Sequence, residues 1–229
     1  MALSPLEEIR DRIGRAESVA RRPPDDVTLI AISKTQSVEA IEALIAQGQE
    51  EFGENRVQEA QAKWASPIEG HPALRALHPG LRLHLVGQLQ SNKAEEAVLL
   101  FDTIHSVDRP SLVAALGKAI LRTGRSPACF LQVNIGDEPQ KGGCAVADLP
   151  GLVETAKTAG LNLVGLMALP PEGVESAPYF ALLAKLARRH GLSGLSMGMS
   201  ADFETAILCG ATHVRIGTAL FGERGRANG

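Results

Sequence analysis

The feature that most constrains the fold is a regular alternation of short apolar runs with segments of helical periodicity. Eight runs rich in branched residues recur along the chain, and a helical pattern follows each of them. Strands that alternate with helices form parallel sheets, because each helix returns the chain to the edge where the next strand begins. Eight such units favour a closed (β/α)8 barrel over an open doubly wound sheet. The predicted strands are 27–32, 50–53, 82–87, 102–107, 129–134, 163–169, 192–197 and 213–217.

The length of 229 residues is close to the ~250 residues that one barrel typically needs. No low-complexity linker divides the sequence, so we expect a single domain over 1–229, with the barrel proper at about 27–224. An extra helix should precede the barrel, because Ser4 can cap a helix, Pro5 suits its first turn and Glu7 completes a capping box. Further helices are predicted near 37–47, 55–64, 92–99, 109–123, 146–159, 175–190 and 201–209, with a short last one from 218.

Capping residues mark several of these helix boundaries. Polar side chains at the expected starts can accept the free N–H groups of the first turn. Glycines at the expected ends can adopt the left-handed conformation that terminates many helices. The predicted N-caps are Ser37, Asn55, Asp108 and Ser200, and the predicted terminal glycines are Gly48, Gly124, Gly160, Gly191 and Gly210.

Composition argues against several classes of protein. The formal net charge is −3, and the absence of a basic tract or aromatic platform argues against nucleic-acid binding. No apolar stretch reaches the ~18 residues expected of a membrane span, and the charged N-terminal segment has no signal-peptide core. The three cysteines form no CxxC pair, and the six histidines show no metal-binding spacing. We therefore expect a cytoplasmic protein with free thiols and without a metal site.

One lysine stands in an informative place. In the stretch VTLIAISKTQ (27–36), Lys34 directly follows a strand that reads as buried on both faces. Because a lysine is costly to bury without a partner or a loss of charge, Lys34 either points into water or has its amine held in a pocket for chemistry. Active sites of (β/α)8 barrels lie at the C-terminal ends of the strands, and Lys34 is at such an end.

Candidate residues also stand at or near the ends of the other predicted strands. We expect them to collect with Lys34 at one end of the barrel, as a ligand site requires. They are Asn55 after the second strand, His84 and His105 in the third and fourth, Asn134 at the end of the fifth, Met167 in the sixth, Ser200 after the seventh, and Arg215, Gly217 and Thr218 at the eighth.

The loops after the last two strands suggest a phosphate site. SMGMS (196–200) combines a glycine, the hydroxyl of Ser200 and the predicted start of a helix, and RIGTALFG (215–222) repeats that design with Gly217 and Thr218. Helix N-termini bind anions, and barrels often hold phosphate at these two loops. The alternative is that Gly198 and Gly217 only serve tight turns.

A lysine at the end of the first strand, facing a phosphate cradle, suggests pyridoxal 5'-phosphate (PLP). The aldehyde of PLP would form a Schiff base with Lys34, and the cradle would hold the phosphate. Arg215 alternates with Val214 and Ile216, so its side chain faces the opposite way. If it points inward, it can donate a hydrogen bond to the ring nitrogen, which would then stay unprotonated. Otherwise, Arg215 forms a salt bridge at the mouth of the barrel.

The motifs extend over most of the chain, from about residue 5 to 224, and they closely resemble those of the pyridoxal phosphate homeostasis protein family. These motifs are ISKTQ, FGENRVQE, HLVGQLQSNK, HSVDRP, LQVNIGDEPQKGG, GLMALPP, LSMGMSADFETAI and VRIGTALFGER. The resemblance implies a barrel like the N-terminal domain of alanine racemase, with PLP on Lys34. Cys144 and the insert at 66–80 look less typical of the family.

The resemblance also implies roles for individual residues. Phosphate contacts are implied for Ser200, Gly217 and Thr218, and a contact to the ring nitrogen for Arg215. The resemblance further implies that three other residues line the pocket: Asn55, Asn134 and Met167. Family members bind PLP without an established catalytic activity and take part in vitamin B6 homeostasis, and indirectly in amino-acid and keto-acid balance.

Two functions stay open at this point, together with a weaker third. The first is a non-catalytic PLP carrier and regulator, and PLP-dependent apo-enzymes are its possible recipients. The second is a PLP-dependent amino-acid racemase or Schiff-base aldolase of the same barrel, and the third is a scaffold without cofactor.

Racemases of this type use a second acid/base tyrosine from a further domain, which we expect to be absent here. The only tyrosine, Tyr179, falls in a predicted outer helix. We therefore expect a carrier without catalytic residues, and a monomer.

Overall fold

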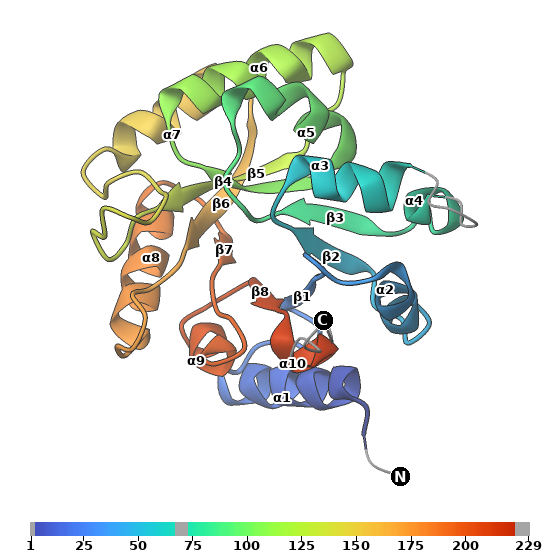
Figure 1. Cartoon of the computed structure of the whole chain (residues 1–229). Helices are drawn as coiled ribbons and strands as arrows, with labels where there is room; N and C mark the ends of the chain where they lie inside the picture. Colours follow the sequence, from blue (N-terminus) through green and yellow to red (C-terminus); the bar gives the residue numbers. More distant parts are fainter. Residues whose placement is uncertain (1–2, 67–72, 223–229) are drawn as a thin grey trace.

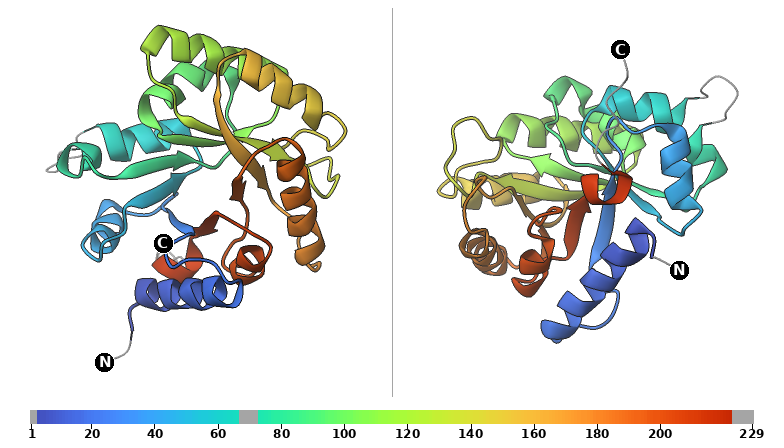
Figure 2. Two further views of the ribbon diagram at one scale, coloured as in Figure 1. Left: turned by 180° about the vertical axis from the view of Figure 1, so that it is seen from behind. Right: turned by 60° about the horizontal axis from the view of Figure 1, so that its bottom comes forward.

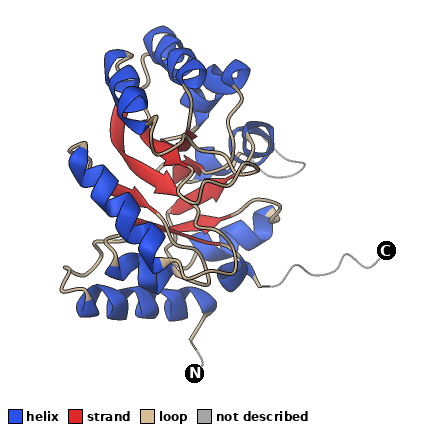
Figure 3. Cartoon of the chain, turned by 90° about the vertical axis from the view of Figure 1, so that its left-hand side faces the viewer, coloured by secondary structure: helices blue, strands red, loops and turns tan. Residues whose placement is uncertain are grey.

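The computed structural model describes residues 3–66 and 73–222. Eight parallel strands close into a barrel in the order β1 to β8, and β8 pairs with β1. Figure 1 and Figure 3 show the helices arranged outside the strands. The prediction of a closed (β/α)8 barrel is confirmed. The strands are β1 (Thr28–Ile32), β2 (Glu51–Glu54), β3 (Arg82–Leu85), β4 (Thr103–Val107), β5 (Ala128–Val133), β6 (Asn162–Ala168), β7 (Gly194–Ser196) and β8 (His213–Ile216).

The helices follow the predicted segments closely. None of the described helices is long and apolar enough to cross a membrane. The helices are α1 (Pro5–Val19), α2 (Val38–Ile45), α3 (Val57–Ala60), the π-helix η1 (Gln61–Ala65), α4 (Leu74–Leu77), the 3-10 helix η2 (Ser91–Lys93), α5 (Ala94–Leu100), α6 (Pro110–Thr123), α7 (Leu149–Thr158), α8 (Ala177–Arg189), α9 (Phe203–Leu208) and α10 (Thr218–Phe221).

The extra N-terminal helix packs onto the barrel beside the last two helices. Ser4 and Glu7 form the predicted capping box, and the apolar face of α1 is buried. In Figures 1 and 2, α1 (blue) lies alongside α9 and α10 (red), so the first helix and the last two helices meet on one side of the barrel. Arg12 on α1 joins Glu204 on α9 in an ion pair of 2.8 Å.

Three of the four predicted N-caps are wrong. Only Ser37 caps its helix through its side chain. The helices α3, α6 and α9 begin later than expected, at the N-caps Arg56, Arg109 and Asp202. The predicted residues have other roles: Asn55 lines a cavity, Asp108 pairs with Arg109 at 2.6 Å, and Ser200 lies in a turn before α9. The five predicted terminal glycines all have a positive φ, as expected.

The segment around the predicted insert at 66–80 contains a short helix, α4, which the sequence pattern did not predict. Residues 67–72 of that insert lie outside the described residues. Cys144, which looked less typical of the family, extends the sheet. It pairs with Val133 as an isolated parallel bridge, and its N–H donates to Gln132 O at 2.9 Å.

The buried side chains form two zones. One zone fills the layer between the strands and the helices and is almost entirely apolar. The other zone is the interior of the barrel. The buried residues Ile30, Phe130 and Met167 lie outside the first zone and share the interior with polar side chains. The buried polar residues of the interior are His84, His105, Gln132, Ser196 and Arg215.

Candidate functional site

A cavity of about 270 Å³ opens at the C-terminal end of the barrel strands. Seven of the eight proposed cofactor-binding residues line it, and they come from the ends of five different strands. The sequence did not single out the apolar residues that complete its wall. The lining residues are Ile32, Lys34, Asn55, Val86, Met167, Leu169, Met199, Ser200, Arg215, Gly217 and Thr218.

Lys34 is half-buried in the wall of this cavity. Among the described residues, no carboxylate forms an ion pair with its Nζ, and no hydrogen bond satisfies it. A lysine amine that is partly withdrawn from water and lacks a counter-ion is suited to act as a nucleophile. Of the two possibilities that the sequence left open, the structure supports the pocket.

The backbone on both sides of Lys34 is held by a buried ion-pair cluster, which sequence reasoning missed. Lys63 Nζ donates to Ser33 O at 2.8 Å and to Glu54 Oε1 at 2.9 Å. Glu54 is fully buried, and its Oε1 also accepts a hydrogen bond from Ser33 Oγ at 2.8 Å. Lys63 further pairs with Glu59 at 3.0 Å. The residue that precedes Lys34 is therefore anchored through both its carbonyl and its hydroxyl.

Thr35, on the other side of Lys34, has a left-handed backbone with a φ of 60°. This conformation is uncommon for a residue other than glycine, and a β-branched residue is strained in it. The Thr35 N–H donates to Glu59 Oε1 at 2.5 Å. Burial opposes the ionisation of Glu59, but this N–H and the Lys63 ammonium together hold the pKa of Glu59 below its usual value. An ionised Glu59 thus stabilises the strained turn that aims Lys34.

The loops after β7 and β8 present two hydroxyl-bearing residues to the same cavity. Ser200 and Thr218 both line it. The N–H groups of Ser200 and Ala201 donate to no acceptor among residues 3–66 and 73–222. Gly198 makes the tight approach possible, because it has a φ of 95° and an added Cβ would lie 2.6 Å from the Cβ of Ala206. These groups can bind an anion.

Arg215 points inward from β8, as the alternation of the strand predicted. Its side chain is buried and lines the floor of the cavity. Nη1 donates to Ser196 Oγ at 2.6 Å, and Nη2 donates to Ala168 O at 3.1 Å. Burial lowers the pKa of Arg215 to about 10, partly offset by the charge of Asp202. The guanidinium is therefore still charged at neutral pH, and within residues 3–66 and 73–222 it forms no salt bridge at the barrel mouth.

Asn55 and Met167 also line the cavity. The backbone of Asn55 packs so closely on Gly87, at the end of β3, that an added Cβ would lie 2.2 Å from Asn55 O. The close packing fixes Asn55 at the cavity. Met167 is buried within β6 and contributes an apolar surface.

Asn134 is the one proposed residue that does not line the cavity. Its side-chain amide donates to Glu138 O at 2.8 Å, and its Oδ1 accepts from Glu138 N–H at 3.0 Å. Both ends of the amide thus fold the loop after β5 back on itself. Its role as a cofactor contact stays a prediction.

His84 and His105 do not join the candidate site, and that expectation is wrong. Both lie below it in the barrel interior, where the His105 ring stacks on Phe130 with centroids 4.6 Å apart. Burial and, after it, the nearby charge of Arg215 hold the pKa of His105 well below its usual value. For the same reasons the pKa of His213 is lowered to about 3. The rings of His105 and His213 are therefore neutral at neutral pH.

The cysteines are not candidates for chemistry. The structure holds all three as free thiols. Burial raises the pKa of Cys129 to about 12 and that of Cys144 to about 11, so neither is a thiolate at neutral pH.

The sequence matches a known domain family and named proteins over nearly its full length. The profile of the family "Alanine racemase, N-terminal domain" matches residues 5–225. The pyridoxal phosphate homeostasis protein of Pseudomonas aeruginosa is 41% identical over 226 residues, which cover 96% of this chain and 94% of that protein.

Solved structures give the same assignment. PipY of Synechococcus elongatus, solved with PLP bound, is 39% identical, with a TM-score of 0.74 over 93% of this chain and 100% of that chain. Alanine racemase of Clostridium difficile shares only the fold, at 14% identity and a TM-score of 0.69 over 92% of this chain and 55% of that chain. The chain therefore belongs to the alanine racemase N-terminal domain family and, within it, to the pyridoxal phosphate homeostasis proteins.

Proposed function

We propose that this protein binds PLP in the cavity at the C-terminal end of the barrel, covalently through Lys34. The observation that carries the proposal is the arrangement around one cavity of two hydroxyl-bearing loops, a buried arginine and a lysine amine that has no partner among the described residues. PLP supplies an aldehyde that condenses with a primary amine to form a Schiff base, and Lys34 Nζ is the amine. PipY, a relative at 39% identity, is solved with PLP bound.

The residues present fit the phosphate of such a cofactor. Ser200 and Thr218 offer hydroxyls, and the N–H of Ser200, which has no acceptor among the described residues, adds a donor from the same loop. Gly217 stands between the end of β8 and the start of α10 without a side chain that would fill the space. Donors of this kind bind phosphate oxygens through charge-assisted hydrogen bonds.

Arg215 fits the ring nitrogen. A guanidinium can only donate hydrogen bonds, so it favours an unprotonated pyridine nitrogen. A ring in this state withdraws electrons less strongly than a protonated one. This suits a protein that holds the cofactor more than one that drives carbanion chemistry, although racemases of the same fold exist. Met167 and the apolar residues Ile32 and Val86 would exclude water from the ring.

The test of PLP binding is a spectroscopic titration of the purified protein. Addition of PLP should produce a visible absorption band, and borohydride reduction should fix the label on the peptide that contains Lys34. Lys34→Ala should abolish the band. The control is Lys157→Ala, which removes an exposed lysine that pairs with Glu154 on α7. An unchanged band in Lys34→Ala would overturn the proposal.

We propose further that the protein carries PLP and does not catalyse racemisation or aldol cleavage. Tyr179 lies on α8 and packs against the outer core, away from the residues that line the cavity. Apart from Lys34, the cavity wall holds no histidine, tyrosine or carboxylate among the described residues that could serve as a second acid/base. Interconversion of amino-acid enantiomers, or cleavage of an aldol substrate, at rates comparable to those of established enzymes would contradict this proposal.

We infer that apo-enzymes dependent on PLP receive the cofactor, which would explain a role in vitamin B6 homeostasis. The test mixes the loaded protein with an apo-enzyme and an excess of a trap for free PLP. Reactivation that survives the trap indicates direct transfer, and its loss indicates release into solution. The monomeric state and the cytoplasmic location stay predictions; light scattering after size exclusion measures the first.

A further inference from the structure

A continuous chain of hydrogen bonds runs through the barrel interior from Arg215 to Glu51. Arg215 Nη1 lies 2.6 Å from Ser196 Oγ, which lies 2.8 Å from His105 Nδ1. His105 Nε2 lies 2.9 Å from His84 Nδ1, and His84 Nε2 lies 2.6 Å from Glu51 Oε2. Four hydrogen bonds therefore link the floor of the proposed cofactor cavity, on β8, to the first residue of β2 at the opposite end of the barrel.

When the rings of His84 and His105 are neutral, the groups at the two ends determine which atom donates and which accepts in each of these hydrogen bonds. An ionised Glu51 can only accept, so His84 must carry its proton on Nε2 and accept on Nδ1. His105 must then carry its proton on Nε2 and accept on Nδ1. The hydroxyl of Ser196 consequently donates to His105 and accepts from Arg215, which can only donate. Every donor points from the guanidinium toward the carboxylate.

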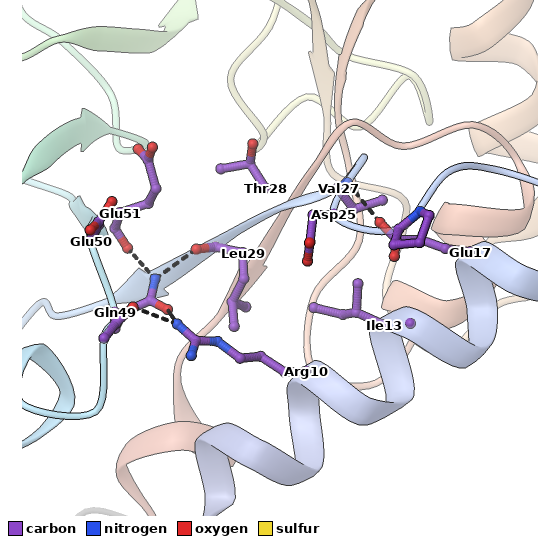
Figure 4. A pocket seen from close by; sticks show the side chains of 13 residues that line it. Arg10, Ile13, Glu17, Asp25, Val27, Thr28, Leu29, Gln49, Glu50 and Glu51 are labelled. Atoms are coloured by element: carbon purple, nitrogen blue, oxygen red, sulfur yellow. Dashed lines mark hydrogen bonds between the residues drawn. The ribbon is translucent and has the colours of Figure 1, made fainter.

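The two ends carry opposite charges, and the Glu51 end is the more exposed to water. Arg215 is 5% exposed, and none of the ion pairs in the described part of the chain includes it. The side chain of Glu51 is 26% exposed and also lies 3.8 Å from Arg82. It lines a groove of about 530 Å³ between α1 and the N-terminal ends of the strands, where Figure 4 shows it beside Glu50 and Thr28.

The rings in the middle are held by packing that leaves little freedom to turn. The His105 ring is fully buried and lies parallel to Phe130, with 3° between the planes. Phe130 has room only because β6 and β7 present glycines to it. An added Cβ would lie 2.6 Å from its Cε1 at Gly165 and 2.8 Å at Gly194. The barrel thus places two glycines where they allow an aromatic ring to support a histidine.

We propose that Ser196, His105, His84 and Glu51 form a directed hydrogen-bond relay that couples Glu51 to Arg215 from a distance and fixes the orientation of its guanidinium. These four are positioning residues: none of them lines the cofactor cavity. Asp202 is the carboxylate whose charge acts directly on Arg215, but no ion pair within the described residues joins the two. A buried cation is unfavourable unless further groups stabilise it, and polarised hydrogen bonds in a low-dielectric interior can transmit the charge of a distant partner.

The relay has a consequence for the cofactor, and this part rests on the proposed function. If Arg215 donates a hydrogen bond to the ring nitrogen, the relay polarises the guanidinium and so changes the strength of that hydrogen bond. Glu51 would then tune the ring from the far end of the barrel, without touching it.

The first test measures proton positions in the cofactor-free protein. Long-range ¹H–¹⁵N correlation spectra at neutral pH should show the neutral Nε2–H tautomer for both His84 and His105. The resonances are assigned to each histidine by their loss from the spectra of His84→Gln and His105→Gln. Ser196→Ala removes the donor to His105 Nδ1, so the Nδ1 resonance of His105 should shift toward that of an unbonded nitrogen and that of His84 should follow. An imidazolium at His84, an Nδ1–H tautomer at either ring, or unchanged resonances in Ser196→Ala would each overturn the relay.

The second test compares two carboxylates that line the same groove. Glu51→Gln keeps a hydrogen-bond acceptor but removes its charge. Glu50→Gln changes an exposed neighbour that is not part of the hydrogen-bond relay. In the PLP-loaded protein, Glu51→Gln and Ser196→Ala should shift the absorption maximum in the same direction, and Glu50→Gln should match the wild type. Identical spectra for Glu51→Gln and the wild type would refute the transmission to the ring.

The two proposals fail separately. A protein that takes up no PLP on Lys34 overturns the proposed function, while the tautomers of the cofactor-free protein still decide whether the relay exists.

Discussion

At the scale of single residues, the proposed chemistry of Lys34 depends on neighbours that do not touch the cavity. Ser33 is tied to Glu54 and Lys63, and Thr35 is tied to Glu59. Lys34 itself has no such partner in the described part of the chain, which leaves its amine available. The backbone is rigid on both sides of a side chain that must still reach a ligand.

We predict that Lys63→Met destabilises the fold and disturbs the site. It leaves the carboxylate of Glu54 fully buried without a counter-charge, which costs about 3–5 kcal/mol in the free energy of unfolding. Urea unfolding at pH 7 measures the loss, and Lys157→Met on the surface of α7 is the control. A change below about 1 kcal/mol, typical of surface pairs, would contradict the buried role of this cluster.

The phosphate loops give a second prediction at this scale. Ser200→Ala and Thr218→Val should each raise the dissociation constant of PLP by ~10–150-fold, because a lost charge-assisted hydrogen bond costs about 1.5–3 kcal/mol. The visible band should persist at saturating PLP, since the aldehyde reacts elsewhere. Thr155→Val on α7 provides a matched control, as its hydroxyl bonds only within its own helix. Unchanged off-rates in the double variant would refute the phosphate assignment.

At the scale of elements, the structure gives a reason for the high glycine and serine content of the seventh strand. GLSGLSM looks too rich in glycine and serine for a buried strand, yet β7 forms at 194–196 and pairs with both neighbours. Its glycine makes room for Phe130, and Ser196 points into the interior to bond with Arg215. The unusual composition reflects what the strand faces inside the barrel.

We predict opposite effects for two glycine-to-alanine changes. Gly165→Ala places a Cβ 2.1 Å from Gly194 O, so strands β6 and β7 must separate, at a cost of about 1–3 kcal/mol or more. Gly151→Ala, in α7, meets nothing within 4 Å and should stabilise the protein by about 0.5–1 kcal/mol. Thermal unfolding measures both. Equal melting temperatures for the two variants would show that the close approach of β6 to β7 does not make a Cβ at position 165 destabilising.

At the scale of the whole molecule, the barrel interior makes stability depend on pH. His105 is fully buried, and its pKa is well below the usual value, chiefly because of burial. In the unfolded chain its pKa returns to about 6.5. Below that pH the unfolded chain binds a proton that the native protein does not, so stability is lost as the pH falls from 6.5 toward the native pKa.

The expected slope is about 1.4 kcal/mol per pH unit for His105 alone, and His213, with a pKa near 3, adds to it. Urea unfolding at pH 6.5, 5.5 and 4.5 measures this slope, and His105→Gln should reduce it by that amount. A variant with an undiminished slope would mean that His105 is protonated in the native state.

Much of the fold could be predicted from periodicity, because short apolar runs and helical patterns report local burial. All eight strands and the N-terminal helix lie where these patterns placed them. Helix starts were less accurate: Asn55, Asp108 and Ser200 are capping residues by type, but the chain needs them in the loops before the helices. Lys34 and the two glycine-bearing loops could be found because strand ends converge in a barrel.

The sequence alone determined the barrel, the end at which the candidate cavity opens and the family, because those depend on order and spacing along the chain. Only the tertiary structure decided which polar residues belong to the site. His84 and His105 stand at strand positions like the others, but the tilt and register of the strands place them inside the barrel, in the chain from Glu51 to Arg215. The cluster of Glu54, Glu59 and Lys63 that holds the backbone around Lys34 likewise forms only when two strand ends and a helix meet.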